Sequence, residues 1–163
     1  MPHYEYYLKY YLNCGRIIRD EEVPLIENID AAILVNLIEN MKLKTNGLDM
    51  DVWHGGYIID GVPLNETNWC KTTHCRAGYI VCMAGAAGFN LETKAGSTAR
   101  AASLILLKSG VDVPDFHADT DDALLDIIHK AKEQGFTPSD EDLKALFEHY
   151  GIDEDFAREQ LRL

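Results

Sequence analysis

The chain has 163 residues, 47% of them hydrophobic and 26% charged, and its formal net charge is −12. This length suits a single domain with a core of its own, and the charge argues against nucleic-acid binding, because phosphate binding relies on basic patches. The longest mostly apolar stretch, residues 77–89, is too short to span a membrane, and the first residues lack the pattern of a secretion signal. We therefore expect a cytoplasmic protein with reduced cysteines that binds neither nucleic acid nor membrane.

The chain begins with a tyrosine-rich segment. Residues 4–12 contain five tyrosines, a residue type that favours strands. A second short extended stretch, residues 16–19, follows the turn signal Cys14-Gly15. We expect a small β element within this N-terminal segment, residues 1–22.

The first helix is predicted after Pro24. From Asp30 onward, apolar residues recur at spacings of three and four and so share one helix face: Ile33, Leu34, Leu37, Ile38 and Met41. Asp30 is the expected N-cap of this helix. Asn46-Gly47 is expected to end it.

The next segment combines a turn signal with a glycine-rich helix. Two short apolar runs flank Asp60-Gly61 within residues 57–64, which predicts a hairpin or an ordered loop. Thr72 or Thr73 is expected to cap a helix over residues 77–85. The many glycines and alanines of that helix indicate that a neighbouring backbone comes close to it.

Four further helices are predicted after residue 96. The first is capped by Ser97 or Thr98 and is apolar nearly all round, so we expect it in the core. The second begins in the acidic run 119–122, which suits the helix dipole. The last two begin at Thr137-Pro138 and at Asp153.

Together these signals predict a mainly α protein, a compact single-domain helical bundle of about five or six helices with a small β element near the N-terminus. The whole chain, residues 1–163, forms this domain. Residues 1–22 are its extended segment, residues 23–135 its helical core and residues 136–163 a C-terminal helical pair.

Side chains able to do chemistry gather on both sides of the predicted hairpin. They comprise Trp53, His54, Cys70, Thr73, His74, Cys75 and Arg76. No other part of the sequence brings imidazole, thiol and guanidinium groups so close together along the chain. This cluster is where we look first for a functional site.

The stretches Leu48-Asp49-Met50-Asp51-Val52-Trp53-His54 and Cys70-Lys71-Thr72-Thr73-His74-Cys75-Arg76-Ala77-Gly78-Tyr79 resemble an uncharacterised family of bacteria and phages. The core of that family reads Trp-His…Cys-x-Thr-Thr-x-Cys-Arg-Ala-Gly-Trp and is often found after pentapeptide repeats. The resemblance extends over residues 23–131. This chain departs from the family in having Tyr79 in place of Trp, a longer segment between His54 and Cys70, and no pentapeptide repeat. The resemblance implies a compact helical module, phage- or mobile-element-encoded, with no catalytic residue to carry over.

One interpretation of the cluster is a zinc-stapled structural module. His54, Cys70, His74 and Cys75 offer the imidazole and thiolate groups that tetrahedral zinc takes. The spacing argues against this set, since adjacent His74 and Cys75 would have to point the same way. Neighbouring side chains on a helix diverge by about 100°.

A second interpretation is a cysteine-dependent enzyme centred on Cys75. A thiol in the first turn of a helix and beside Arg76 has its pKa lowered by the helix dipole and by the cation. A base and an orienting carboxylate complete such a site. The candidates for these roles are His54, His74, Asp49 and Asp51.

We favour a third, architectural interpretation. Thr72 or Thr73 caps the helix, Arg76 pairs with an acidic residue, and Cys75 and Cys82 share a helix face because they are seven residues apart. Three aromatic side chains pack around this corner: Trp53, Trp69 and Tyr79. On this interpretation the chain has no catalytic residue and no cofactor.

The resulting functional hypothesis is a protein-binding module and not an enzyme. Its partner is a protein that the sequence does not identify, or a second copy bound through the tyrosine-rich N-terminus. An acidic surface favours a basic partner. For a phage-encoded protein, an inhibitor of a host factor is the fitting class.

Overall fold

The computed structural model describes residues 4–5, 18–43, 47–59 and 61–162. Within them the chain is mainly helical, with seven α-helices and one small antiparallel sheet, which confirms the predicted fold class. The elements in chain order are η1 (Asp20–Glu22), α2 (Ile29–Lys42), β1 (Ile58–Ile59), β2 (Val62–Pro63), η2 (Trp69–Lys71), α3 (Arg76–Met83), α4 (Gly85–Ala95), α5 (Thr98–Lys108), α6 (Thr120–Glu133), α7 (Asp140–Tyr150) and α8 (Glu154–Leu161). None of the helices in this part of the chain combines the length and the apolar character that a bilayer span requires.

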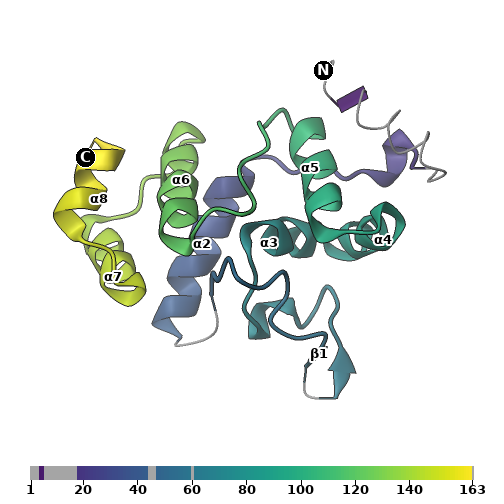
Figure 1. The fold of residues 1–163 in the computed structure, drawn as a ribbon, viewed down its shortest axis with the longest axis horizontal. Helices are drawn as coiled ribbons and strands as arrows, with labels where there is room; N and C mark the ends of the chain where they lie inside the picture. Colours follow the sequence, from purple (N-terminus) through teal and green to yellow (C-terminus); the bar gives the residue numbers. More distant parts are fainter. Residues whose placement is uncertain (1–3, 6–17, 44–46, 60, 163) are drawn as a thin grey trace.

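The helices form two groups that meet along α2 and α3 (Figure 1). Helices α3, α4 and α5 pack on one another, while α2 packs on α6, and α7 and α8 cover the far end. One continuous hydrophobic core runs through both groups. Its fully buried members include Ile33, Leu37, Ile80, Leu104 and Ile127.

Helix α2 buries the apolar face that its spacing predicts, with Ile33, Leu34 and Leu37 inside the core. The prediction that Asp30 caps it is wrong. The N-cap is Asn28, in the left-handed region at φ 53°, and Asp30 lies in the first turn. Asp30 is almost fully buried, and its carboxylate accepts hydrogen bonds from Arg76 of α3 and from Gln134 at the end of α6. It therefore does not cap the backbone amides of the first turn.

Helix α4 was not predicted from the sequence. The run Gly85-Ala86-Ala87-Gly88 carries no apolar period, and its two glycines disfavour a helix. Gly85 adopts φ 65° and turns the chain between α3 and α4. A Cβ on Gly88 would lie 2.0 Å from the carbonyl oxygen of Val81. A neighbouring backbone therefore does come close to the helix predicted over residues 77–85, as its glycines and alanines indicated. The contact is between Val81 of α3 and Gly88 of α4.

The remaining helix starts agree with the sequence at three positions and differ at one. Helix α6 begins at Thr120, within the predicted acidic run 119–122. Ser97 caps α5 by accepting from Arg100 N at 3.1 Å, and Asp153 caps α8 by accepting from Phe156 N at 2.8 Å. Helix α7 is capped by Ser139, so Pro138 lies before the cap and not at the first helical position. The Ser139 hydroxyl satisfies a first-turn amide, which a proline ring cannot do.

The small β element is the hairpin β1–β2, where Ile58 pairs with Pro63 and Ile59 with Val62. Gly61, with φ 78°, lies in its turn, as the Asp60-Gly61 signal predicts. The extended stretches expected in residues 4–12 and 16–19 fall largely on residues 6–17, outside the described part of the chain. Tyr4 and Glu5, which are described, are helical.

A buried ion pair joins the two groups of helices. Arg76, the first residue of α3, donates to Asp30 of α2 at 2.7 Å and to Asp126 of α6. Arg76 and Asp30 are 2% and 1% exposed. Gln134 donates to the second Asp30 oxygen at 3.2 Å, so both oxygens of that buried carboxylate are hydrogen-bonded. Arg76 thus pairs with acidic residues, as expected from the sequence, and this pairing adds a polar link between α3 and helices α2 and α6 to their shared hydrophobic core.

Replacing Arg76 by Met should lower the free energy of unfolding by about 3–5 kcal/mol, because it leaves the buried Asp30 carboxylate without its charged partner. Asp126→Asn should cost about 1 kcal/mol or less, because the Asp126 side chain is 40% exposed. Urea unfolding followed by circular dichroism measures both changes. Lys132→Ala, an exposed position on the same helix as Asp126, is the control. Equal losses for all three variants would contradict this role of Arg76.

Candidate functional site

A loop formed by residues 47–55 wraps around the segment that precedes α3. His74 N donates to Gly47 O at 3.2 Å and His74 O accepts from Asp49 N at 3.1 Å. On the other side, Gly55 N donates to Thr73 O at 2.6 Å. His74 therefore forms a parallel bridge with Leu48 and an antiparallel bridge with His54. The 47–55 loop holds His74 on both sides through backbone bonds.

The same loop crosses the first turn of α3 at Gly78. A Cβ on Gly78 would lie 2.0 Å from the carbonyl oxygen of Trp53, so only glycine allows the two backbones to come this close. Cys75 N also donates to Val52 O at 2.8 Å. This crossing carries His54, the residue after Trp53, to the face of α3.

The N-cap of α3 is Cys75, and the prediction that Thr72 or Thr73 caps it is wrong. Cys75 Sγ accepts from Gly78 N at 3.4 Å and donates to Trp53 O at 3.7 Å. Thr73 precedes the helix by three residues, and its carbonyl is committed to Gly55. The bonding to the 47–55 loop keeps this segment extended up to Cys75, which delays the helix start.

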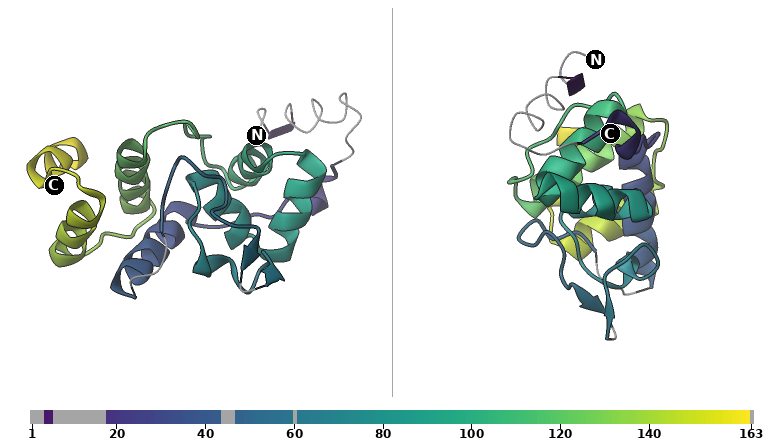
Figure 2. Two further views of the ribbon diagram at one scale, coloured as in Figure 1. Left: turned by 60° about the horizontal axis from the view of Figure 1, so that its bottom comes forward. Right: turned by 90° about the vertical axis from the view of Figure 1, so that its right-hand side faces the viewer.

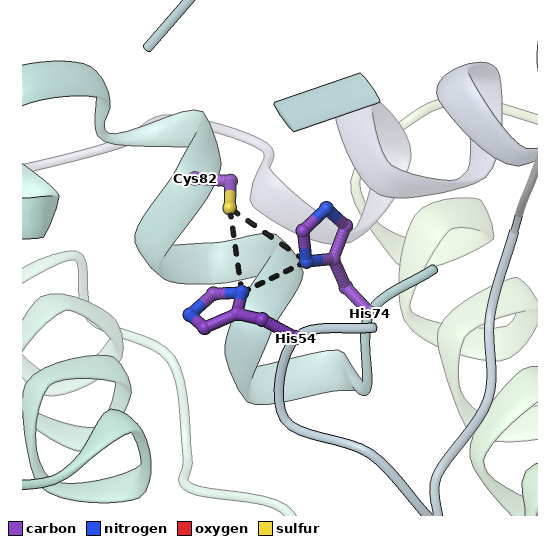
Figure 3. A group of neighbouring side chains, drawn as sticks. All are labelled: His54, His74 and Cys82. Carbon is purple, nitrogen blue, oxygen red and sulfur yellow. Dashed lines mark hydrogen bonds between the residues drawn. The ribbon is translucent and has the colours of Figure 1, made fainter. Parts of the chain in front are cut away.

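Three buried side chains meet where the loop crosses α3 (Figure 3). His54 Nδ1 and His74 Nδ1 are 2.8 Å apart, and Cys82 Sγ lies 3.8 Å from the first and 3.9 Å from the second. His54, His74 and Cys82 are 6%, 0% and 1% exposed. We call these three residues the His–His–Cys cluster.

Each imidazole of the cluster is held by a second bond at its far nitrogen. His54 Nε2 lies 2.8 Å from a Glu92 carboxylate oxygen, and His74 Nε2 lies 2.7 Å from the carbonyl oxygen of Trp69. Burial alone would raise the pKa of Glu92, but hydrogen bonds from His54 and Thr98 outweigh it and this pKa is lowered. Burial lowers the pKa of His74 to about 4 and raises that of Cys82. The rings are therefore fixed in orientation, and His74 is neutral near neutral pH.

Aromatic rings enclose one side of the cluster. Tyr79 packs edge-on against both His74 and Trp69, with ring centroids 5.3 and 6.0 Å away. Its hydroxyl accepts from Asn40 at 3.4 Å, so this buried hydroxyl has a partner. Trp53 instead packs against His117 at 6.0 Å and is 38% exposed. Of the three aromatic residues expected to pack together here, Trp69 and Tyr79 contact the His74 ring of the cluster, and Trp53 packs elsewhere.

The structure brings together two of the four residues considered as a zinc set. His54 and His74 meet, whereas Cys70 is exposed and Cys75 binds the loop backbone. The third member of the observed cluster is Cys82, which the sequence analysis assigned to packing. Sequence spacing could not have identified it, because His74 lies in the extended segment before α3 and only Cys82 is on the helix. Thr73 and Arg76 have the structural roles described above.

The conditions for a reactive Cys75 are not met in this geometry. Burial raises the pKa of its thiol, and the amide hydrogen bonds near Gly78 do not offset that effect. The Arg76 guanidinium, expected to stabilise a thiolate, binds Asp30 and Asp126 instead. The expected orienting acids do not bind an imidazole, since Asp49 accepts from Asp51 N. The carboxylate that does orient His54 is Glu92, which sequence reasoning missed because it lies on the unpredicted helix α4.

Gly78→Ala should destabilise the protein by about 2–4 kcal/mol, because the added methyl group overlaps the Trp53 carbonyl and forces the 47–55 loop away from α3. Gly56→Ala is the matched control, since the nearest atom to its new Cβ is a side-chain carbon of Ile59 at 3.5 Å. Thermal unfolding of both variants measures the difference. A Gly78→Ala protein as stable as the Gly56→Ala protein would refute the close crossing.

The cysteines should differ sharply in their reaction with iodoacetamide. Of the three cysteines that the structure describes, exposed Cys70 should label first, whereas Cys75 and Cys82 should label at least about tenfold more slowly, because both are buried and have raised pKa values. Peptide-resolved mass spectrometry over a time course measures each rate. Labelling of the native protein at Cys75 before Cys70 would instead favour the cysteine-nucleophile interpretation.

Comparison with known proteins leaves the function to be inferred from these residues. No family model matches this chain. No curated protein and no solved structure matches it either.

Proposed function

We propose that this chain is a protein-binding module whose docking element is the hairpin of residues 57–64. The hairpin extends from the helical body on the side of the 47–55 loop (Figures 1 and 2). Its connection to the body is short on both sides, since His54 and η2 flank it. The hairpin thus presents a small surface away from the core.

The apolar exposure of the hairpin is the observation that carries this proposal. Tyr57, Ile58 and Val62 are 63%, 71% and 50% exposed, and Trp53, four residues before Tyr57 in the chain, is 38% exposed. Half of the large hydrophobic residues that are exposed in the described part of the chain fall within residues 53–62. Exposed apolar residues that gather in this way are typical of interaction surfaces.

The hairpin is also held in a defined shape before any partner binds. Leu64 N donates to Tyr57 O at 2.8 Å, which closes the base of the hairpin. Asn65 and Asn68 side-chain amides both donate to Pro63 O, at 3.0 and 3.1 Å. A preorganised element loses little conformational entropy on binding. These bonds therefore favour recognition through this hairpin.

The charge around the hairpin indicates the chemistry of the partner. Residues 49–66 contain four acidic residues and no lysine or arginine. A partner with an apolar groove rimmed by basic residues is complementary to this surface. A second copy of the chain would bring like charges together at the same place, so we assign the hairpin to a different protein. The phage or mobile-element resemblance makes a host protein the first class to test.

Placing a photo-crosslinking amino acid at Ile58 should yield a covalent adduct with a partner in cells, because Ile58 is 71% exposed, more than Tyr57 or Val62. The same amino acid at Val35, 37% exposed on α2, is the matched control. Mass spectrometry identifies the adduct. Ile58→Ser should then weaken binding of the identified partner about tenfold or more, whereas Val35→Ser should not.

Two outcomes would contradict the proposal. If the adducts at position 58 contain only a second copy of the chain, the hairpin mediates self-association and not binding to a different protein. Equal adducts at positions 58 and 35, or a partner whose affinity Ile58→Ser leaves unchanged, would remove the hairpin from the binding surface.

A further inference from the structure

The donor atoms of the His–His–Cys cluster have an unusual arrangement. Three atoms of the kind that bind transition metals lie within 4.8 Å of one another, supplied by His54, His74 and Cys82. They come from three segments: the 47–55 loop, the residues before α3, and α3 itself (Figure 3). Folding therefore assembles this set, and no one segment contains it.

Hydrogen bonding fixes which nitrogen of each ring carries a proton. A carbonyl oxygen only accepts, so His74 Nε2 must donate to Trp69 O. An ionised Glu92 carboxylate likewise accepts from His54 Nε2. A neutral imidazole protonated at Nε2 has a lone pair at Nδ1. Both facing Nδ1 atoms are then acceptors, only 2.8 Å apart in a buried place.

Two buried acceptors at this distance require a positive centre. The Cys82 thiol can donate to one Nδ1 but not to both, and its Sγ is almost equally far from the two. A bound cation would satisfy both lone pairs at once, and it would ionise the thiol, as coordination does. The alternative centre is a proton shared by the two rings.

The distances suit a metal ion. The point in the plane of the three donor atoms that is equidistant from them lies about 2.1 Å from each. This matches zinc–nitrogen distances of about 2.0–2.1 Å, and a slight shift of the ion away from Cys82 gives the zinc–sulfur distance of about 2.3 Å. The far-nitrogen partners, a carboxylate and a backbone carbonyl, are those that metal-bound histidines usually have. Imidazole with thiolate selects zinc or copper(I) over magnesium or calcium.

We propose that His54, His74 and Cys82 bind one transition-metal ion of the zinc or copper(I) class. The ion would bind His54 of the 47–55 loop and Cys82 of α3 together. It would thereby also hold the start of the hairpin, where Tyr57 packs on the His54 ring. An ion in the plane of the three donor atoms has the trigonal geometry that copper(I) accepts, whereas a tetrahedral zinc ion would lie out of that plane, toward one further ligand. This assignment differs from the set His54, Cys70, His74 and Cys75 considered from the sequence. It does not depend on the proposed docking function.

The test uses the full chain, purified under reducing conditions, incubated with zinc or copper(I) and freed of excess metal. Mass-spectrometric metal analysis should find about one equivalent of one of these ions. Loading with Co²⁺ should give intense d–d bands and a thiolate-to-cobalt charge-transfer band in the near ultraviolet. Removal of the ion by a chelator should lower the melting temperature by about 5 °C or more, since the ion binds only the folded state.

Matched cysteine variants assign the ligands. Cys82→Ser should lose the charge-transfer band and most of the bound metal, whereas Cys70→Ser, at an exposed thiol, should keep both. Circular dichroism checks that each variant folds. If Cys82→Ser does not fold, alkylation of the native wild-type protein decides, since bound metal should slow the labelling of Cys82 and leave that of Cys70 unchanged.

Three results would overturn the proposal. The first is folded wild-type protein that binds less than about a tenth of an equivalent of metal and shows no charge-transfer band. In that case a proton shared by the two imidazoles would be the positive centre. The second is Cys82→Ser protein that binds metal as the wild type does. The third is loss of the metal in Cys70→Ser or Cys75→Ser while Cys82→Ser retains it. That result would favour the ligand set considered from the sequence: His54, Cys70, His74 and Cys75.

Discussion

The close crossing of the 47–55 loop over α3 is the constraint on which the rest of the candidate site depends. With no side chain at Gly78, the Trp53 carbonyl reaches the helix backbone, and the Cys75 thiol and amide bind the loop from the other direction. Once the loop lies there, His54 has no freedom to leave the face of α3. The distance between the two imidazoles thus follows from backbone packing, before any bond between the rings is considered.

Arg76 extends this arrangement to the whole molecule. It begins α3 directly after the Cys75 cap and reaches both Asp30 and Asp126 on the other group of helices. A buried charge of this kind contributes little net stability, because desolvation offsets most of the attraction, but losing one partner is costly. It links α2 and α6 to the first turn of α3, the helix that carries Cys82 of the His–His–Cys cluster.

The cluster and the hairpin are neighbours along the chain and in space. The His54 ring packs edge-on against Tyr57, with centroids 5.7 Å apart, so the buried donor set and the exposed apolar surface are separated by a single ring contact. A rigid base under a small exposed hairpin limits the shapes that it can adopt. The two proposals remain independent in their chemistry, since one concerns buried donor atoms and the other exposed apolar ones.

The sequence by itself determined the elements that follow from periodicity and capping: the apolar face of α2, the caps Ser97 and Asp153, and the turn at Gly61, all of which depend on residues a few positions apart. It also indicated that His54 and His74 belong to one region. Only the tertiary structure decided that α4 exists, that Cys75 caps α3, and that Cys82 and Glu92 join the histidines. The reason is physical: these outcomes depend on contacts between segments distant in the chain, such as Gly88 against Val81 or Trp53 against Gly78, and local patterns carry no record of such contacts.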